Sequence, residues 1–269
     1  MTMPTHIVVV FVVVLMIAAF AHGHDQDGEV QFGYKGDLGP DKWGNLNNAF
    51  QDCSNGKLQS PVNIVKKDAF LNNKLGSLKR EYNKANATLV NNGVNIGIQW
   101  QCETGNLKVD GKNYTLKESI WHTPSEHTFD GEGYVAELQH FHYSEDGKIA
   151  VVACLYKKGK SDAFYTELKD SLAELSKETC AADEQAQILF GVVKPKYLMK
   201  SSSKYYRYVG SLTLPPCTEN ITWIILGKVR ELSDEQIEAL KAPLGEDYKS
   251  NARPTQPLNA RKLNIYERD

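Results

Sequence analysis

Residues 114–156 read YTLKESIWHTPSEHTFDGEGYVAELQHFHYSEDGKIAVVACLY, and they decide the fold because three strand-like segments follow one another there. The segments 114–122, 134–143 and 149–156 are short and rich in β-branched or aromatic residues. Turn signals such as Asp130-Gly131 and Asp146-Gly147 separate them. The pattern predicts antiparallel neighbours in one sheet, with residues 94–101 as a further strand.

Two helices are predicted after this region. Four apolar residues recur at helical spacing after Ser161-Asp162, namely Phe164, Leu168, Leu172 and Leu175. Ser233 and Gln236 form a capping box in front of a second apolar helical pattern. The chain carries no internal repeat or low-complexity linker, so we expect one mainly β (α+β) domain with a few surface helices.

The N-terminus resembles a secretory signal peptide. Residues 7–20 form an unbroken apolar run, and small residues up to Gly23 precede polar sequence. The run is too short to span a membrane, although no Lys or Arg precedes it. We therefore expect a signal peptide over residues 1–23 and a single domain over 24–269; the alternative is a buried segment of the mature fold.

Charge and cysteine content narrow the possible partners. The net charge of −2 gives no reason to expect nucleic acid or an acidic membrane. The odd number of cysteines leaves at least one thiol unpaired within the chain. They are Cys53, Cys102, Cys154, Cys180 and Cys217. Cys154 lies in an apolar run and is predicted to be a buried structural thiol, and no CxxC pair indicates a Cys-bound metal.

Four segments carry a family resemblance. They are QSPVNI at 59–64, WHTPSEHT at 121–128, YVGSLTLPPC at 208–217 and RPTQPLN at 253–259. Together, and in this order, they resemble the α-carbonic anhydrases over roughly residues 34–263. The resemblance implies the α-carbonic anhydrase fold, in which a large central, mostly antiparallel twisted sheet with peripheral helices carries an active-site cone on one face. It also implies a disulfide between Cys53 and Cys217, which would contribute about 5 kcal/mol by closing a long loop.

The zinc ligands of the family are only partly present. The resemblance implies two histidines at alternate positions of one strand and a third on its neighbour, and here these positions hold Ile120, His122 and Gln139. A catalytic zinc needs three protein ligands, so one vestigial histidine predicts no zinc and no other cofactor. A one-residue register slip would instead bring His140 and His142 to the site. The other interpretation places both histidines behind the sheet, where the family has a structural position matching His142.

Other parts of the family site persist. Glu126 and Thr213 match a pair in which the carboxylate orients the hydroxyl, so we predict catalytic roles for His122, Glu126 and Thr213. The expected substrate-binding residues are Asn92, Ile120, Gln139, Phe141, Val151, Leu212, Leu214 and Trp223, with Ile221 in the same apolar wall. The usual proton-shuttle histidine is replaced by Val94. A neutral His122 acting as a general base allows only slow, zinc-independent chemistry.

Within the family, the altered zinc motif resembles that of the dioscorins, a group of tuber storage proteins. This implies a nitrogen reserve in the secretory pathway, vacuolar or extracellular, and a monomer or weak dimer. It also implies weak carbonate dehydratase, dehydroascorbate and monodehydroascorbate reductase activities and trypsin inhibition. The predicted partners are small anions, either bicarbonate or ascorbate and dehydroascorbate, and proteases. Reductase chemistry needs a reductant, and the sequence has no nucleotide-binding glycine motif. A pure binding module remains a third hypothesis.

Overall fold

A computed structural model describes residues 31–101, 104–178, 185–200 and 202–268. The predicted signal peptide, Cys102 and Cys180 lie outside these residues. The strands are β1 (Asn63–Ile64), β2 (Phe70–Leu71), β3 (Lys79–Tyr82), β4 (Ala85–Asn91), β5 (Ile96–Trp100), β6 (Gly105–Val109), β7 (Lys112–His122), β8 (Thr128–Phe129), β9 (Ala136–Tyr143), β10 (Ile149–Lys158), β11 (Ala186–Val193), β12 (Lys204–Ser211), β13 (Glu219–Leu226), β14 (Arg230–Leu232) and β15 (Asn264–Glu267). The helices are α2 (Trp43–Leu46), α3 (Asp52–Asn55), α4 (Ala163–Leu175) and α5 (Asp234–Lys241), with 3₁₀ turns at Gly36–Leu38, Asn48–Phe50, Lys66–Asp68 and Pro195–Tyr197.

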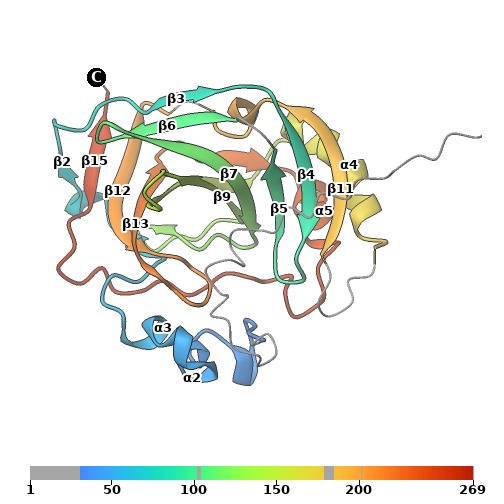
Figure 1. The fold of residues 1–269 in the computed structure, drawn as a ribbon, viewed down its shortest axis with the longest axis horizontal. Coiled ribbons are helices and arrows are strands. Elements are labelled where there is room, and N and C mark those ends of the chain that lie inside the picture. The colour runs from blue at the N-terminus through green and yellow to red at the C-terminus, as the bar shows by residue number, and fades with distance from the viewer. Residues whose placement is uncertain (1–30, 102–103, 179–184, 201, 269) are drawn as a thin grey trace, which may run out of the picture. The chain divides into compact units, whose positions relative to one another are not determined.

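One large sheet dominates the fold (Figure 1). Within the described residues it contains 13 strands, ten of them in the order β11-β4-β5-β7-β9-β10-β13-β12-β15-β2. Most neighbours are antiparallel, while β10 pairs with β13 and β14, and β15 with β2, in parallel. A separate two-stranded sheet joins β1 to β8. The predicted mainly β fold with a mostly antiparallel sheet is confirmed.

The strands predicted from residues 94–156 are also confirmed. They form β5, β7, β9 and β10, which are consecutive neighbours and antiparallel throughout. The ends differ by a few residues from the prediction, because pairing with other strands, and not composition, sets where each strand stops. β10, for example, continues to Lys158, where it pairs with Leu232 of β14.

Both predicted helices form. The side chain of Asp162 accepts a hydrogen bond from the backbone N–H of Phe164 at 3.0 Å and so caps α4. The Gln236 side chain accepts from the backbone N–H of Ser233 at 3.4 Å and from that of Asp162 at 2.9 Å. The start of α5 is therefore tied to the start of α4. The apolar side of α4, including Leu168, packs in the main hydrophobic core.

The pairing of β9 with its neighbours decides which side chains share a face. Gln139 pairs with Ile120 of β7 and with Ala153 of β10, whereas His140 pairs with Ser119 and Val152. Because successive side chains alternate between faces, Gln139 and Ile120 lie on one face and His140 on the other. The register slip considered from the sequence is therefore wrong. We call the face that carries Ile120, His122 and Gln139 the site face.

Candidate functional site

The three positions predicted to match the family's zinc ligands lie together on the site face. Ile120 and Gln139 are direct partners across β7 and β9, and His122 pairs with Glu137 two residues further along the strands. All are buried, with Ile120 at 4%, His122 at 1% and Gln139 at 0% exposure. The prediction that these three side chains share one face of the sheet is therefore confirmed.

The ring of His122 is fixed by a backbone carbonyl. Its Nδ1 donates to the carbonyl oxygen of Asn251 at 2.7 Å, and since a carbonyl only accepts, Nδ1 carries the hydrogen. In the neutral ring the lone pair then lies on Nε2. Glu126 Oε1 stands 3.5 Å from Nδ1. In its neutral form, His122 thus has Nε2 as its one hydrogen-bond acceptor.

Gln139 is oriented by two carboxylates. Its Nε2 donates to Glu126 Oε2 at 2.7 Å and to Glu137 Oε1 at 3.1 Å. With both amide hydrogens used, Oε1 points away from these partners, and it is buried without a hydrogen bond within the described residues. Leaving a buried acceptor without a partner costs about 1–3 kcal/mol, and a bound water or ligand is one explanation for such an atom.

Glu126 connects the predicted catalytic residues. The backbone N–H of Arg253 donates to its Oε1 at 3.0 Å. Burial raises the pKa of Glu126, while the His122 ring and a side-chain hydrogen bond with Thr213 oppose this rise. His122, Glu126 and Thr213 are each at most 2% exposed. The structure brings the three predicted catalytic residues together, with Glu126 at the centre.

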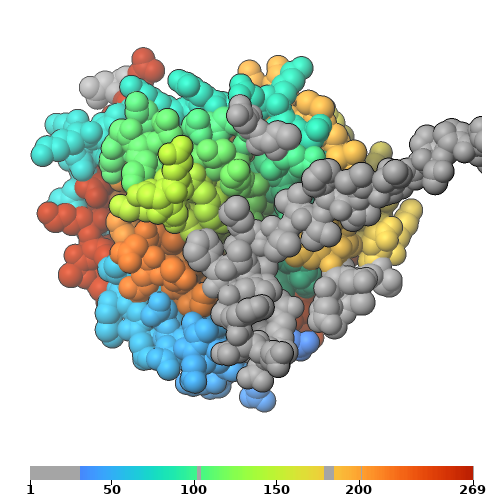
Figure 2. Space-filling view, viewed as in Figure 1, coloured from blue at the N-terminus to red at the C-terminus, as the bar shows by residue number. Residues whose placement is uncertain are grey.

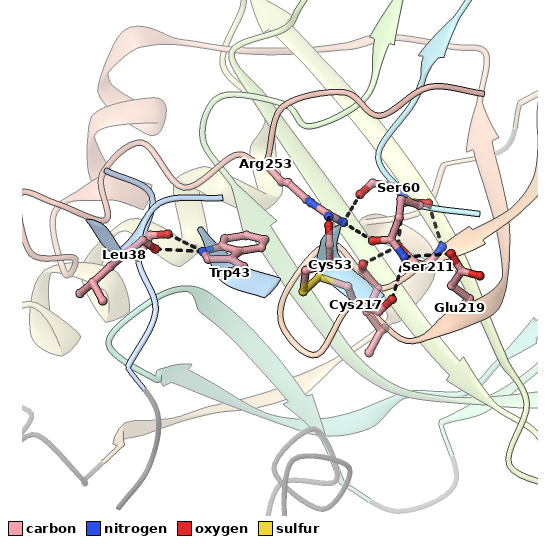
Figure 3. The surroundings of a disulfide bond; sticks show 11 residues. Leu38, Trp43, Cys53, Ser60, Ser211, Cys217, Glu219 and Arg253 are labelled. Atoms are coloured by element: carbon pink, nitrogen blue, oxygen red, sulfur yellow. Dashed lines mark hydrogen bonds between the residues drawn. A yellow bond between two sulfur atoms is a disulfide. The ribbon is translucent and has the colours of Figure 1, made fainter. Parts of the chain in front are cut away.

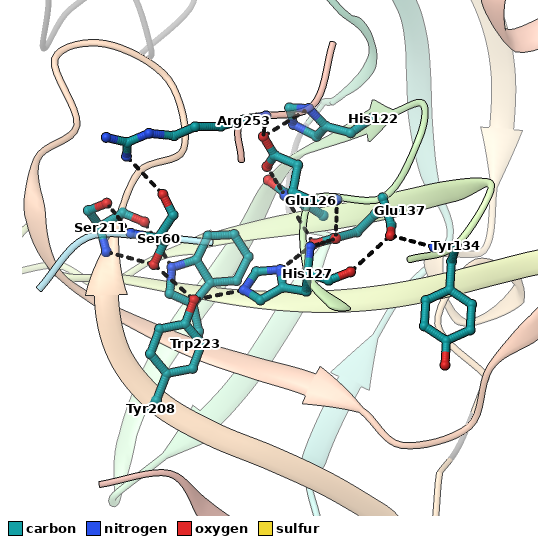
Figure 4. A network of polar contacts seen from close by, with 12 residues as sticks. Ser60, His122, Glu126, His127, Tyr134, Glu137, Tyr208, Ser211, Trp223 and Arg253 are labelled. Carbon is teal, nitrogen blue, oxygen red and sulfur yellow. Dashed lines mark hydrogen bonds and ion pairs between the residues drawn. The ribbon is translucent and has the colours of Figure 1, made fainter. Parts of the chain in front are cut away.

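A polar network below this centre was not assigned from the sequence (Figure 4). Glu137 Oε2 accepts from the backbone N–H groups of Glu126 at 3.0 Å and His127 at 2.8 Å, and its Oε1 accepts from His127 Nδ1 at 2.8 Å. Nε2 of His127 is hydrogen-bonded to the hydroxyl of Tyr208 at 2.7 Å, which reaches Ser60 Oγ at 2.8 Å. Ser60, His127 and Tyr208 lie in the segments that carry the family resemblance, which was the available signal, whereas Glu137 lies outside them.

The charge state of Glu137 follows from this network. Burial raises its pKa, but the His127 ring and the hydrogen bonds that His127 donates outweigh burial, so the pKa of Glu137 lies below its usual value. An ionised Glu137 can only accept hydrogen bonds, which fixes the direction of those from His127 and Gln139. The amide of Gln139 is oriented as a consequence.

Three of the apolar residues predicted to bind substrate are direct partners across neighbouring strands. Val151 of β10 pairs with Phe141 of β9 on one side and with Trp223 of β13 on the other, and all three are buried. Leu212 and Leu214, in the segment after β12, are half-buried. Ile221 is buried on β13. Trp223 also packs against His127 in a tilted arrangement, with ring centroids 4.8 Å apart, so it contacts the polar network around Glu137.

The side chain of Asn92 stabilises the turn in which it lies. Its side-chain oxygen accepts from the backbone N–H groups of Val94 at 3.1 Å and Asn95 at 2.7 Å, and it thereby holds its own turn. The side chain is exposed. The geometry therefore gives Asn92 a place in the loop beside β5, and nothing in its described contacts links it to Glu126.

Glu118 is a site-face residue that sequence reasoning missed. It pairs with Phe141 across β7 and β9, and it lies on the same face as Ile120 and His122. Burial raises its pKa to about 7, against which a hydrogen bond from the hydroxyl of Tyr143, 2.7 Å long, acts weakly. The alternate spacing of residues 118, 120 and 122 could have revealed this carboxyl, but its burial could not be read from the sequence.

The disulfide predicted from the family resemblance is present between Cys53 and Cys217 (Figure 3). Beside it, the guanidinium of Arg253 donates to the carbonyl oxygens of Cys53 and Ser60 and to the Gln59 side chain, each at 2.8 Å. The backbone N–H of Arg253 also donates to Glu126. Arg253 therefore contacts both the disulfide-linked loops and the site.

The other cysteine that is described is a buried structural thiol, as predicted. Cys154 is 1% exposed and unpaired, and burial raises its pKa to about 11. On the same face, His140 Nδ1 is hydrogen-bonded to Ser119 Oγ at 2.7 Å, and His142 Nε2 to the hydroxyl of Tyr82 at 2.7 Å. Both histidines lie behind the sheet, which confirms the structural interpretation.

The residues at the three ligand positions do not fit a zinc ion. Ile120 has no lone pair, and the Gln139 amide is a weak neutral donor beside imidazole. Within the described part of the chain, no group of three or more His, Cys, Asp or Glu side chains is arranged to hold a metal. Of the three residues, only His122 has the imidazole nitrogen that zinc prefers, so these side chains do not make up a zinc site.

The fold and site define the class of protein. A family model described as eukaryotic-type carbonic anhydrase matches residues 38–267, and the chain belongs to the α-carbonic anhydrase family. Alpha carbonic anhydrase 7 of Arabidopsis thaliana is 38% identical over 95% of this chain and 91% of its own length. Among the described residues, no helix has the length and apolar character needed to cross a membrane.

Particular relatives include dioscorins. Dioscorin DB3L of Dioscorea polystachya is 39% identical over 86% of this chain and 83% of its own length. A crystal structure of dioscorin complexed with ascorbate aligns with a TM-score of 0.85 at 36% identity, covering 89% of this chain and 99% of that chain. The chain is thus similar both to dioscorins and to proteins named as α-carbonic anhydrases.

Proposed function

We propose that this chain is a dioscorin-like protein that binds a small, hydroxyl-bearing ligand at the site face without zinc, and that serves as a storage protein. The observation that carries the ligand proposal is the unpartnered, buried Oε1 of Gln139. Its neighbours around Glu126 are acceptors as well. His122 offers Nε2, and Thr213 offers its oxygen when its hydroxyl hydrogen is donated to Glu126.

A site built from acceptors selects ligands that donate. Hydroxyl groups of a polyol acid such as ascorbate can donate to Gln139 and His122, whereas a bare anion would meet lone pairs only. Leaving a buried acceptor unpaired costs more than a typical hydrogen bond gains, so a ligand without donors is disfavoured. The dioscorin structure with ascorbate supports this ligand class for a protein of the same fold.

The absence of zinc is part of the proposal. Removing one residue that merely orients a metal ligand typically costs about 10–100-fold in affinity, and two ligands themselves are replaced here. The nitrogen-reserve role rests on the similarity to dioscorins. The disulfide and that similarity support maturation in the secretory pathway, with a signal peptide over residues 1–23 and one domain over 24–269.

The test is calorimetry with ascorbate on the purified chain, together with metal analysis by mass spectrometry. We expect heat of binding and no stoichiometric zinc. Gln139→Leu removes the acceptor and is expected to weaken ascorbate binding about tenfold, the value of one hydrogen bond of about 1.4 kcal/mol. Lys117→Gln changes an exposed residue of the neighbouring strand β7 and should leave binding unchanged. Absence of heat with the wild-type chain, or one zinc per chain, would overturn the proposal.

A second candidate function is slow, zinc-independent hydration of CO₂, and the Nε2 lone pair of His122 favours it. A neutral imidazole acting as a general base contributes about 10²–10⁴-fold, far below a zinc hydroxide. The buried row Phe141, Val151 and Trp223 supplies an apolar surface on the same face. His122→Ala assayed with a chelator should abolish the activity, and unchanged turnover would remove His122 from the mechanism.

A further inference from the structure

We propose that a groove at the β12–β15–β2 edge of the sheet binds a small molecule that carries two or more acidic groups, either phosphates or carboxylates. The groove has a volume of about 410 Å³, which lies within the usual range for small-molecule sites. It is formed by residues distant in sequence, namely Asn72, Lys74, Leu75, Asp110, Arg207, Tyr208, Val209, Arg261, Lys262 and Asn264. These elements lie at one side of the sheet in Figure 1, and in Figure 2 the red C-terminal and cyan segments gather at that edge.

The side chains that line the groove carry more positive than negative charge. Arg207 and Asp110 form a bidentate ion pair, and the charges of these two residues cancel. Lys74, Arg261 and Lys262 remain, and none of them has a carboxylate ion-pair partner in the described ranges. The whole chain carries a net charge of −2, so this excess of positive charge is a local feature. A concave surface of one charge sign concentrates oppositely charged ligands.

Arg261 is held in place before any ligand arrives. Its guanidinium donates to the carbonyl oxygens of Pro257 at 2.7 Å, Leu258 at 2.8 Å and Val209 at 3.1 Å. It also lies over the ring of Tyr208, 5.5 Å from the ring centroid. Neutral carbonyls fix the cation without cancelling its charge, and burial lowers the pKa of Arg261. A cation that is already ordered loses little entropy when an anion binds.

Amide groups add donors to the same groove. Asn72 donates from its side-chain nitrogen to Asn264 Oδ1 at 3.1 Å, and its own oxygen accepts from the backbone N–H of Lys74 at 3.1 Å. The amide nitrogen of Asn264 is left as a donor with no hydrogen bond among the described residues. The groove therefore combines fixed positive charge with a free N–H donor, the combination that phosphate and carboxylate oxygens accept.

Calorimetry with pyrophosphate and with citrate tests the proposal on the intact chain at low ionic strength. We expect binding of one or both, with orthophosphate and glucose much weaker. A preference for pyrophosphate or for citrate identifies phosphate or carboxylate chemistry. Lys74→Gln with Lys262→Gln removes two exposed charges and is expected to weaken binding about tenfold, or about 1.4 kcal/mol. The control, Lys57→Gln with Lys84→Gln, makes the same change in net charge at exposed positions outside the groove.

The outcomes separate the groove from the site face. No heat with either polyanion, or equal weakening in both double variants, would overturn the proposal, since the latter indicates only a general charge effect. Binding that persists in His122→Ala and is not displaced by ascorbate assigns the polyanion to the groove. Displacement by ascorbate would instead place the polyanion at the site face and refute a separate groove site.

Discussion

Replacing Glu118 with glutamine should make the chain more stable at neutral and alkaline pH. Glu118 is 6% exposed, its described polar contact is the Tyr143 hydroxyl, and burial raises its pKa from 4.5 to about 7. A carboxyl whose pKa is raised by folding holds its proton more tightly in the folded state. Its contribution to stability is complete below the unfolded pKa and is lost as pH rises toward 7. Glutamine keeps a similar shape and does not titrate.

The size of the effect follows from the pKa values. A rise from 4.5 to about 7, at about 1.36 kcal/mol per pH unit, amounts to about 3 kcal/mol of unfolding free energy. Urea unfolding of wild type and Glu118→Gln near pH 4 should therefore give similar free energies, whereas near pH 8 the variant should be about 3 kcal/mol more stable. The difference between the two proteins should grow steadily between these limits.

Two further variants make the result interpretable. Glu145→Gln alters an exposed carboxyl and should stay within about 0.5 kcal/mol of wild type at both pH values. Tyr143→Phe removes a hydrogen bond that lowers the pKa of Glu118, so it should steepen the loss of stability toward alkaline pH. If Glu118→Gln and wild type show parallel pH profiles, the reasoning that Glu118 is a desolvated carboxyl on the site face is refuted.

Three other predictions concern the metal, the disulfide and the buried network. Ile120→His combined with Gln139→His restores three imidazoles on one face, so the double variant should bind stoichiometric zinc by mass spectrometry and neither single variant should. Cys53→Ser with Cys217→Ser opens a loop with a sequence separation of 164 residues and should cost about 5 kcal/mol in urea unfolding; a loss under 1 kcal/mol would contradict the loop-closure argument. His127→Phe removes the partner of a buried carboxylate and should cost about 3–5 kcal/mol, which an unchanged urea midpoint would exclude.

The strands that carry the site could be predicted because their patterns are local. Alternating side chains and Asp-Gly turns determine β7, β9 and β10, and that periodicity alone puts Ile120 and His122 on one face. The same rule separates Gln139 from His140, which the observed register bears out. Which residues share the site face could thus be predicted without coordinates, whereas their match to zinc ligands rests on the family resemblance.

The environment of each group could not be predicted, because it is created by distant segments. Arg253 binds the carbonyl of Cys53 across 200 positions and holds Glu126 through its backbone N–H across 127 positions. The groove likewise joins residues around 72, 110, 208 and 262. The elevated pKa of Glu118 depends on burial, and burial is a property of the packed sheet.

The two carboxylates of the site receive hydrogen bonds from the protein itself. Glu137 is satisfied by two backbone N–H groups and by His127, and Glu126 by Arg253 and Gln139. The amide of Gln139 donates to both of these carboxylates. What the amide adds is Oε1, an acceptor where a metal ligand would otherwise stand. Under the proposed function, this oxygen would accept a hydrogen bond from the ligand at a position that the family resemblance assigns to a zinc ligand.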